Sequence, residues 1–65
     1  MSGSIIKIHK DFGTIETIDG RRYYFDSTLL KDADYTPKLN DVVLFNETIF
    51  STGRRVARNV QLVKR

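Results

Sequence analysis

The sequence contains no cysteine, no tryptophan, one proline and one histidine. Without cysteine the chain can form neither a disulfide nor a thiolate metal site, and the single His9 cannot hold a metal by itself. Its longest apolar runs are three or four residues, whereas a membrane-spanning helix needs about 20. The opening Met-Ser-Gly-Ser lacks the basic region and apolar core of a signal peptide. We therefore expect a soluble protein of a reducing compartment, the cytoplasm and also the nucleus, with no membrane association, metal or cofactor.

The length and charge of the chain set further bounds. Its 65 residues make one domain at most. The 11 basic and 8 acidic side chains give a net charge of +3, which many small domains carry without binding nucleic acid. Placement is more informative than the total, because the basic residues gather in three clusters: Arg21 and Arg22; Arg54, Arg55 and Arg58; Lys64 and Arg65. Clustered arginine points weakly to phosphate.

Short β-branched and aromatic runs between turn residues predict five strands, over residues 4–9, 12–18, 21–26, 41–48 and 56–63. Asp19-Gly20 predicts a tight type I′ turn with positive φ at both positions, and Gly53 marks the last turn. The polar connection over residues 27–40 is expected to hold one helical turn around residues 29–33. Five short strands and one long connection predict an all-β closed barrel, because closure removes exposed edges. We expect the domain to cover residues 4–63, with residues 1–3 a natural tail or a cloning remnant.

Alternation along the strands divides side chains between the two faces of the sheet. The consistent solution puts one set inside the barrel: Ile6, Ile8, Ile15, Tyr23, Phe25, Val43, Phe45 and Val60. The outer face of the first three strands then carries Lys7, His9, Phe12, Thr14, Arg22 and Tyr24.

Four fragments resemble the motifs of cold-shock domains, in the same order and at similar spacing. Phe12-Gly13-Thr14-Ile15 resembles their Phe-Gly-Phe-Ile, and residues 19–27 resemble their Asp-Gly followed by Val-Phe-Val-His and Ser. Residues 39–45 are similar to their Leu-x-x-Gly-Asp-x-Val-x-Phe, and residues 57–60 to their Ala-x-Asn-Val. The resemblance implies a five-stranded OB-fold barrel that binds single-stranded RNA or DNA. It implies outward aromatics on the second and third strands, helped by a tryptophan on the first strand and by lysines.

The chain departs from that pattern on the binding face. Lys7 stands at the tryptophan position, Thr14 replaces the second phenylalanine, Asp11 a glycine and Asp26 the histidine. Each stacked base contributes roughly 1–3 kcal/mol, so the loss of two aromatic platforms removes roughly 2–6 kcal/mol. The resemblance therefore implies weak, low-specificity binding of single-stranded RNA or DNA by a non-canonical member. The candidate binding residues are Lys7, Phe12, Arg22, Tyr24, Arg54, Arg55 and Arg58.

Other interpretations of the same residues stay open. Phe12 and Tyr24 can form a cross-strand pair that only stabilises the sheet, and the last-hairpin arginines can keep a strand edge soluble. Val42 and Leu44 are expected to point outward, as a protein contact in a larger RNA-regulatory protein that has lost RNA binding. Such a contact would be made with a partner protein or with neighbouring domains of a larger chain. The sequence shows no catalytic constellation, so we expect no enzyme activity.

Overall fold

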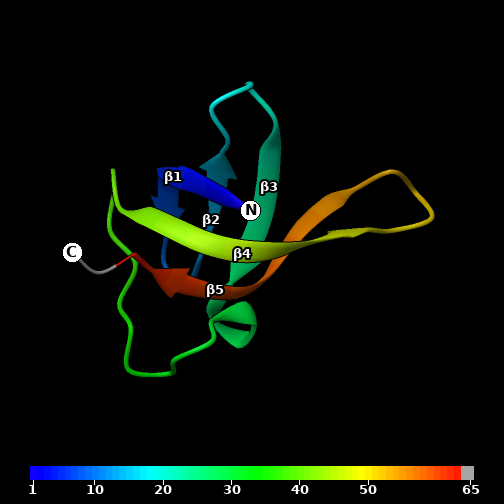
Figure 1. Ribbon diagram of the computed structural model, residues 1–65. Coiled ribbons are helices and arrows are strands. Elements are labelled where there is room, and N and C mark those ends of the chain that lie inside the picture. The colour runs from blue at the N-terminus through cyan, green and yellow to red at the C-terminus, as the bar shows by residue number, and fades with distance from the viewer. Residues whose placement is uncertain (64–65) are drawn as a thin grey trace.

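The computed structural model describes residues 1–63 and shows a closed barrel of five strands (Figure 1). The strands are β1 (Ser2–His9), β2 (Phe12–Glu16), β3 (Arg22–Asp26), β4 (Val42–Ile49) and β5 (Arg55–Leu62), with a 3₁₀ turn η1 (Ser27–Leu29) after β3. Around the barrel they run β1-β2-β3-β5-β4, and β4 closes on β1. Among these five strands of the described residues, only β3 and β5 pair in parallel. This confirms the predicted all-β, five-stranded OB-fold barrel; the predicted cluster at Lys64 and Arg65 lies outside the described residues.

A bulge in β1 changes which isoleucine enters the core. Ile5 pairs with Ile15 and Lys7 pairs with Thr14, so Ile6 is an extra residue in β1. Such an insertion shifts the alternation by one position. Ile5 is therefore fully buried and Ile6 only half-buried, and the prediction that Ile6 faces inside was wrong. After the bulge, Lys7 and His9 are exposed and Ile8 packs against the core, as alternation predicted.

The core confirms most of the predicted interior. Its buried members are Ile5, Ile15, Tyr23, Phe25, Val43, Phe45, Val56, Ala57 and Val60, and Ile8 packs against them. Gly13 allows β1 and β2 to approach closely: a Cβ there would overlap the carbonyl oxygen of Lys7 and would lie 3.0 Å from the ring of Phe25.

The β2–β3 and β4–β5 hairpins share one turn type, which differs from the type I′ turn predicted for Asp19-Gly20. Gly20 has φ +89°, but Asp19 does not adopt positive φ. The Gly20 N–H donates to the Thr17 carbonyl at 2.9 Å, and the Thr17 N–H donates to the Arg21 carbonyl at 2.8 Å. A three-residue loop of this kind needs only its last residue in the left-handed region. Gly53, with φ +88°, repeats the pattern between β4 and β5.

The connection from β3 to β4 is held at several points. Asp26 caps η1 by accepting a hydrogen bond from the Thr28 N–H at 2.9 Å. This cap places the helical turn at residues 27–29, earlier than the predicted 29–33. The Tyr35 hydroxyl donates to Asp41 at 2.6 Å. Within residues 1–63, no helix has the length and apolar character to cross a membrane.

The first residues belong to the barrel rather than to a separate tail. Ser2 pairs with Leu44 and Gly3 with Val43. The amino group of Met1 donates to the Phe45 carbonyl at 3.0 Å. The strand therefore begins two residues before the predicted Ser4, because β4 is long enough to pair with it.

Candidate nucleic-acid interface

Four side chains form a continuous row across the outer face of β1, β2 and β3. The ring centroids of His9 and Phe12 are 5.1 Å apart, and those of Phe12 and Tyr24 are 6.2 Å apart. The guanidinium carbon of Arg54 lies over the Tyr24 ring, 5.6 Å from its centroid. These separations are within the range of favourable aromatic and cation–π contacts. We call His9, Phe12, Tyr24 and Arg54 the stacking row.

A shallow groove of about 340 Å³ runs beside the Tyr24 end of this row. Four cationic side chains line it: Lys7, Arg22, Arg54 and Arg55. The two arginines of the last hairpin reach the groove because Val56, the next residue, pairs in parallel with Tyr24 of β3. In Figure 1 the β4–β5 hairpin projects well beyond the barrel on the side of β3.

The structure thus brings together six of the seven predicted nucleic-acid residues. Phe12 and Tyr24 lie in the row, and Lys7, Arg22, Arg54 and Arg55 lie in the groove. Arg58 is exposed on β5, opposite Asn46 of β4, and it does not line the groove.

Two carboxylates near the face are engaged in local contacts. Glu16 accepts from Nε of Arg22 at 3.1 Å, and these side chains lie opposite each other in the β2–β3 register. Asp26 lies opposite Phe12, but its Oδ1 accepts hydrogen bonds from both the backbone N–H and the hydroxyl of Thr28. Asp26 is therefore a cap for η1, and Glu16 partly neutralises one cation of the groove.

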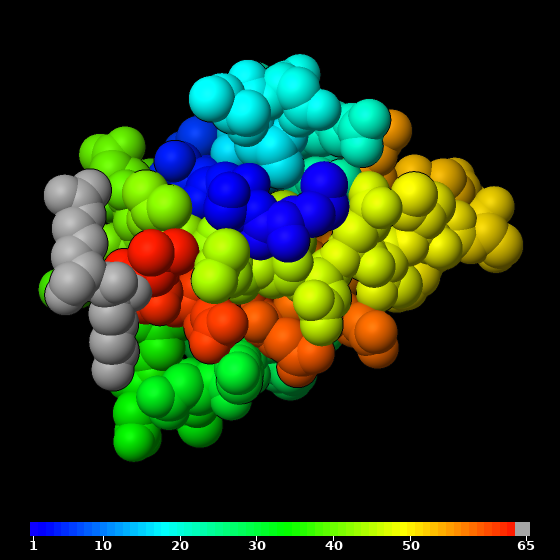
Figure 2. Space-filling view, viewed as in Figure 1, coloured from blue at the N-terminus to red at the C-terminus, as the bar shows by residue number. Residues whose placement is uncertain are grey.

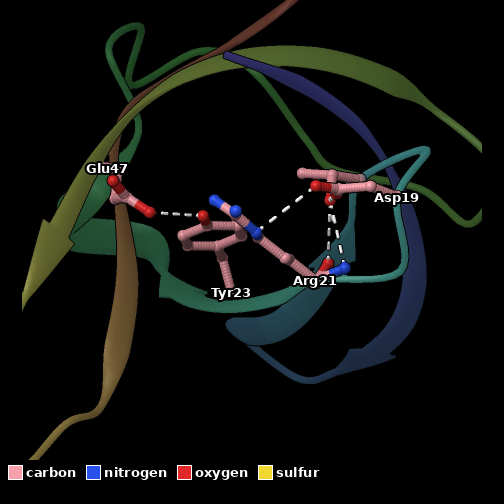
Figure 3. A network of polar contacts seen from close by, with 5 residues as sticks. Asp19, Arg21, Tyr23 and Glu47 are labelled. Atoms are coloured by element: carbon pink, nitrogen blue, oxygen red, sulfur yellow. Dashed lines mark hydrogen bonds and ion pairs between the residues drawn. The ribbon is translucent and has the colours of Figure 1, made fainter.

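A polar network runs from the β2–β3 turn to β4 through Tyr23, which also lines the groove (Figure 3). The Tyr23 hydroxyl donates to Glu47 of β4, and the hydrogen bond to Glu47 together with burial raises the pKa of Tyr23. Arg21 lies against Tyr23 and pairs with Asp19 at 3.3 Å; both contacts raise the pKa of Arg21. The Thr17 hydroxyl donates to Asp19 and lowers the pKa of that carboxyl. Because only β5 lies between β3 and β4 in the barrel, this network links two strands that do not pair with each other.

His9 is the member of the row that the sequence pattern did not identify. Alternation placed it on the outer face, but it was not among the predicted binding residues. The loop of Lys10 and Asp11 makes His9 and Phe12 direct cross-strand partners. The short spacing of His9 and Phe12 around one turn was the signal in the sequence for this contact.

Among the described residues no three His, Cys, Asp or Glu side chains gather into a candidate metal site.

A second exposed surface lies on β4, away from the stacking row. Val42 and Leu44 are each 42% exposed, as their predicted outward orientation requires. Leu62 and Val63 are also exposed, and the Val63 N–H donates to the Val42 carbonyl at 2.9 Å. Figure 2 shows the N-terminal residues, β4 and the end of β5 side by side at this surface. We call Val42, Leu44, Leu62 and Val63 the β4 patch.

Neither a family model nor a curated protein matches the chain. Among solved structures, the CSD456 segment of Drosophila Unr superposes with a TM-score of 0.80 at 23% sequence identity. The match covers 97% of this chain and 26% of that one, so the chain spans about a quarter of the Unr segment. At this identity the likeness establishes the fold alone, and it shows that the barrel is cold-shock-like.

Proposed function

We propose that this domain binds single-stranded RNA or DNA, weakly and with little sequence specificity, on the outer face of β1, β2 and β3. The observation that carries the proposal is the stacking row beside a groove with four cationic side chains. Every base has a π-face that an aromatic ring can stack on, and cationic side chains attract the phosphates that connect the bases. The cold-shock-like fold and the Phe12-Gly13-Thr14-Ile15 resemblance support the same conclusion.

Each part of the face has a distinct task. Phe12, 39% exposed, and Tyr24 offer platforms for one or two bases. The guanidinium of Arg54 lies over the Tyr24 ring. A base either stacks between this guanidinium and the Tyr24 ring or displaces Arg54 from the ring. Lys7 and Arg55 hold the phosphates of the strand. Binding of this kind needs no bond to break, so we propose a binding module without enzyme activity, acting on RNA in the cytoplasm or nucleus.

Weak binding follows from the centre of the face. Lys7 lies opposite Thr14, and Thr14 lies opposite Tyr24. Neither a lysine nor a threonine offers a ring, so the middle of the sheet provides no stacking platform. The affinity therefore depends on one or two stacked bases, each contributing roughly 1–3 kcal/mol, and on phosphate contacts.

Fluorescence anisotropy with labelled oligo-U and a mixed-sequence RNA, at low and high salt, tests this proposal. Replacing both rings, by Phe12→Ala with Tyr24→Ala, removes two platforms and is expected to weaken binding by roughly 30-fold or more. Leu44→Ala on the β4 patch is the matched control and should leave the affinity unchanged. No binding by the unmodified chain at high micromolar protein in low salt would refute the proposal.

The β4 patch supports a second candidate function. Exposed apolar side chains that gather on one part of a surface can mark a protein contact. Val42 and Leu44 are exposed on β4, and Leu62 and Val63 are exposed at the end of the neighbouring strand β5. In this alternative, the domain is a protein-contact module of a larger RNA-regulatory protein that has lost RNA binding. Leu44→Glu should then remove a partner from pull-downs with the full-length protein, while Phe12→Ala with Tyr24→Ala should not. Recovery of the same partners with Leu44→Glu would count against it.

A further inference from the structure

A second cavity, of about 410 Å³, adjoins the stacking row at Phe12. It lies between the end of the β1–β2 hairpin and the connection from β3 to β4. Its walls are mostly apolar and include Ile8, Phe12, Phe25 and Leu30. Phe12 thus belongs both to the stacking row and to the wall of this cavity. We call it the Phe12 pocket.

The walls of the Phe12 pocket come from well-anchored parts of the molecule. Phe25 is buried in the core, and Ile8 packs against that core. Leu30 forms a bridge to Val60, and the Lys31 N–H donates to the Val60 carbonyl at 2.8 Å. On the far side, Tyr35 is fixed by its hydrogen bond to Asp41. A pocket bounded in this way exists before any ligand arrives, which lowers the entropic cost of binding.

Two charged side chains line the pocket on the side of the β1–β2 hairpin. Lys10 and Asp11, which form the two-residue loop between β1 and β2, both line it. A carboxylate accepts hydrogen bonds at two oxygens, and an ammonium group only donates. The pocket therefore combines mostly apolar walls with the two adjacent acceptor oxygens of Asp11, the cation of Lys10 and the hydroxyl groups of Ser27 and Thr36.

We propose that the Phe12 pocket receives one base of a strand bound along the stacking row, and that Asp11 makes guanine the preferred base. This inference rests on the proposed nucleic-acid function. A base has apolar faces and a polar edge, and pockets of some hundreds of Å³ with apolar walls and a few polar groups are typical small-ligand sites. Guanine presents two adjacent donors, N1–H and the exocyclic amino group, to the two oxygens of Asp11. Uracil, cytosine and adenine place an acceptor beside their donor on that edge. Lys10 then contacts the phosphate of the nucleotide whose base enters the pocket.

The test compares labelled oligo-U with otherwise identical oligomers that carry one guanine, inosine, adenine or cytosine at successive positions. Anisotropy titrations of the whole chain are expected to show about tenfold tighter binding for guanine at one position, the gain typical of one hydrogen bond to a charged group. Inosine lacks the exocyclic amino group and should lose most of that gain.

Two variants connect the preference to the pocket. Asp11→Asn places a donor opposite a donor of guanine, so the ratio of guanine to uracil affinity should fall to near one. Ala33→Phe fills the pocket from an exposed position on the connection and should abolish the same ratio. Both variants keep Tyr24, the cations of the groove and the ring of Phe12, which the pocket shares with the stacking row, so both should still bind oligo-U.

The outcomes separate this inference from the proposed function. A guanine preference that both variants lose, with oligo-U binding retained, supports the Phe12 pocket. Equal affinity for all oligomers, or a preference that survives either variant, overturns the pocket and leaves the proposed function standing. Absence of binding to every oligomer, oligo-U included, overturns both.

Discussion

The proposed face predicts a definite dependence of affinity on salt. Four cationic side chains line the groove: Lys7, Arg22, Arg54 and Arg55. Arg22 is already paired with Glu16, whereas no carboxylate of residues 1–63 lies within ion-pair distance of the other three. Each phosphate neutralised on a single strand contributes about −0.7 to the slope of log affinity against log salt. Three such contacts give a slope of about −2, so raising salt from about 50 to about 200 mM should weaken binding roughly 20-fold.

Single substitutions should change this slope in opposite directions. Arg55→Gln removes one phosphate contact and should make the slope about 0.7 less negative. Glu16→Gln frees Arg22 from its partner and should make the slope up to about 0.7 more negative. Arg58→Gln is the control, because it removes the same charge from a residue outside the groove. The measurement is a series of anisotropy titrations with oligo-U at several salt concentrations.

The comparison of Arg55→Gln with Arg58→Gln distinguishes binding along the groove from attraction by the net charge of the domain. If both change the slope equally, the strand senses only the net charge of the domain, and the groove is not its path. A slope close to zero for the unmodified chain would show that phosphate contacts contribute nothing to binding. Either result would refute the assignment of the groove, whatever the absolute affinity.

Three further predictions concern the barrel. Gly13→Ala forces a Cβ against the Lys7 carbonyl oxygen and should cost about 1–3 kcal/mol, measured as a drop of the thermal midpoint by about 4–8 °C per kcal/mol. Burial and Asp41 raise the pKa of Tyr35 above its ordinary value, so this group stabilises the fold below about pH 10 and loses that contribution as pH rises. The free energy of unfolding, measured with urea at about pH 8 and about pH 11, should therefore decline less between these pH values for Tyr35→Phe than for the unmodified chain. Asp26→Ala removes the cap of η1 and should cost about 0.5–2 kcal/mol, yet it should tighten oligo-U binding, since a negative charge leaves the face.

Alternation could predict most of the fold because the strands are buried on one side only. Tyr23 and Phe25 are two residues apart in β3, as Val43 and Phe45 are in β4, and all four lie in the core as expected. The pattern failed at Ile6 because a bulge adds one residue to β1 without a mark in its apolar sequence.

The turn prediction failed for a related reason. Asp-Gly fits both a two-residue loop and a three-residue loop that ends in glycine. The choice between them depends on the register of β2 and β3. That register is set by the packing of Ile15 and Tyr23 in the core, not by the turn residues alone.

The candidate site was predictable within strands but not between them. Phe12, Arg22 and Tyr24 were placed on one outer face by alternation, and the structure confirms that placement. Which arginines of the last hairpin join them depends on the parallel contact of Tyr24 with Val56. A contact between strands so distant in sequence leaves no local pattern. For this reason Arg54, Arg55 and Arg58 looked alike in the sequence, and only the first two line the groove.

The centre of the proposed binding face lacks aromatic rings, and this absence bears on both the affinity and the specificity of binding. Lys7, Thr14 and Tyr24 lie opposite one another across three strands, and only the last is aromatic. Under the proposed function, a bound strand crosses the centre of the sheet without stacking and is held there by the charge of Lys7. Charge attracts phosphates of any sequence, so a face built in this way discriminates poorly between bases. Any preference must then come from a place where one base is enclosed, and on this side of the barrel the cavity beside Phe12 offers that enclosure.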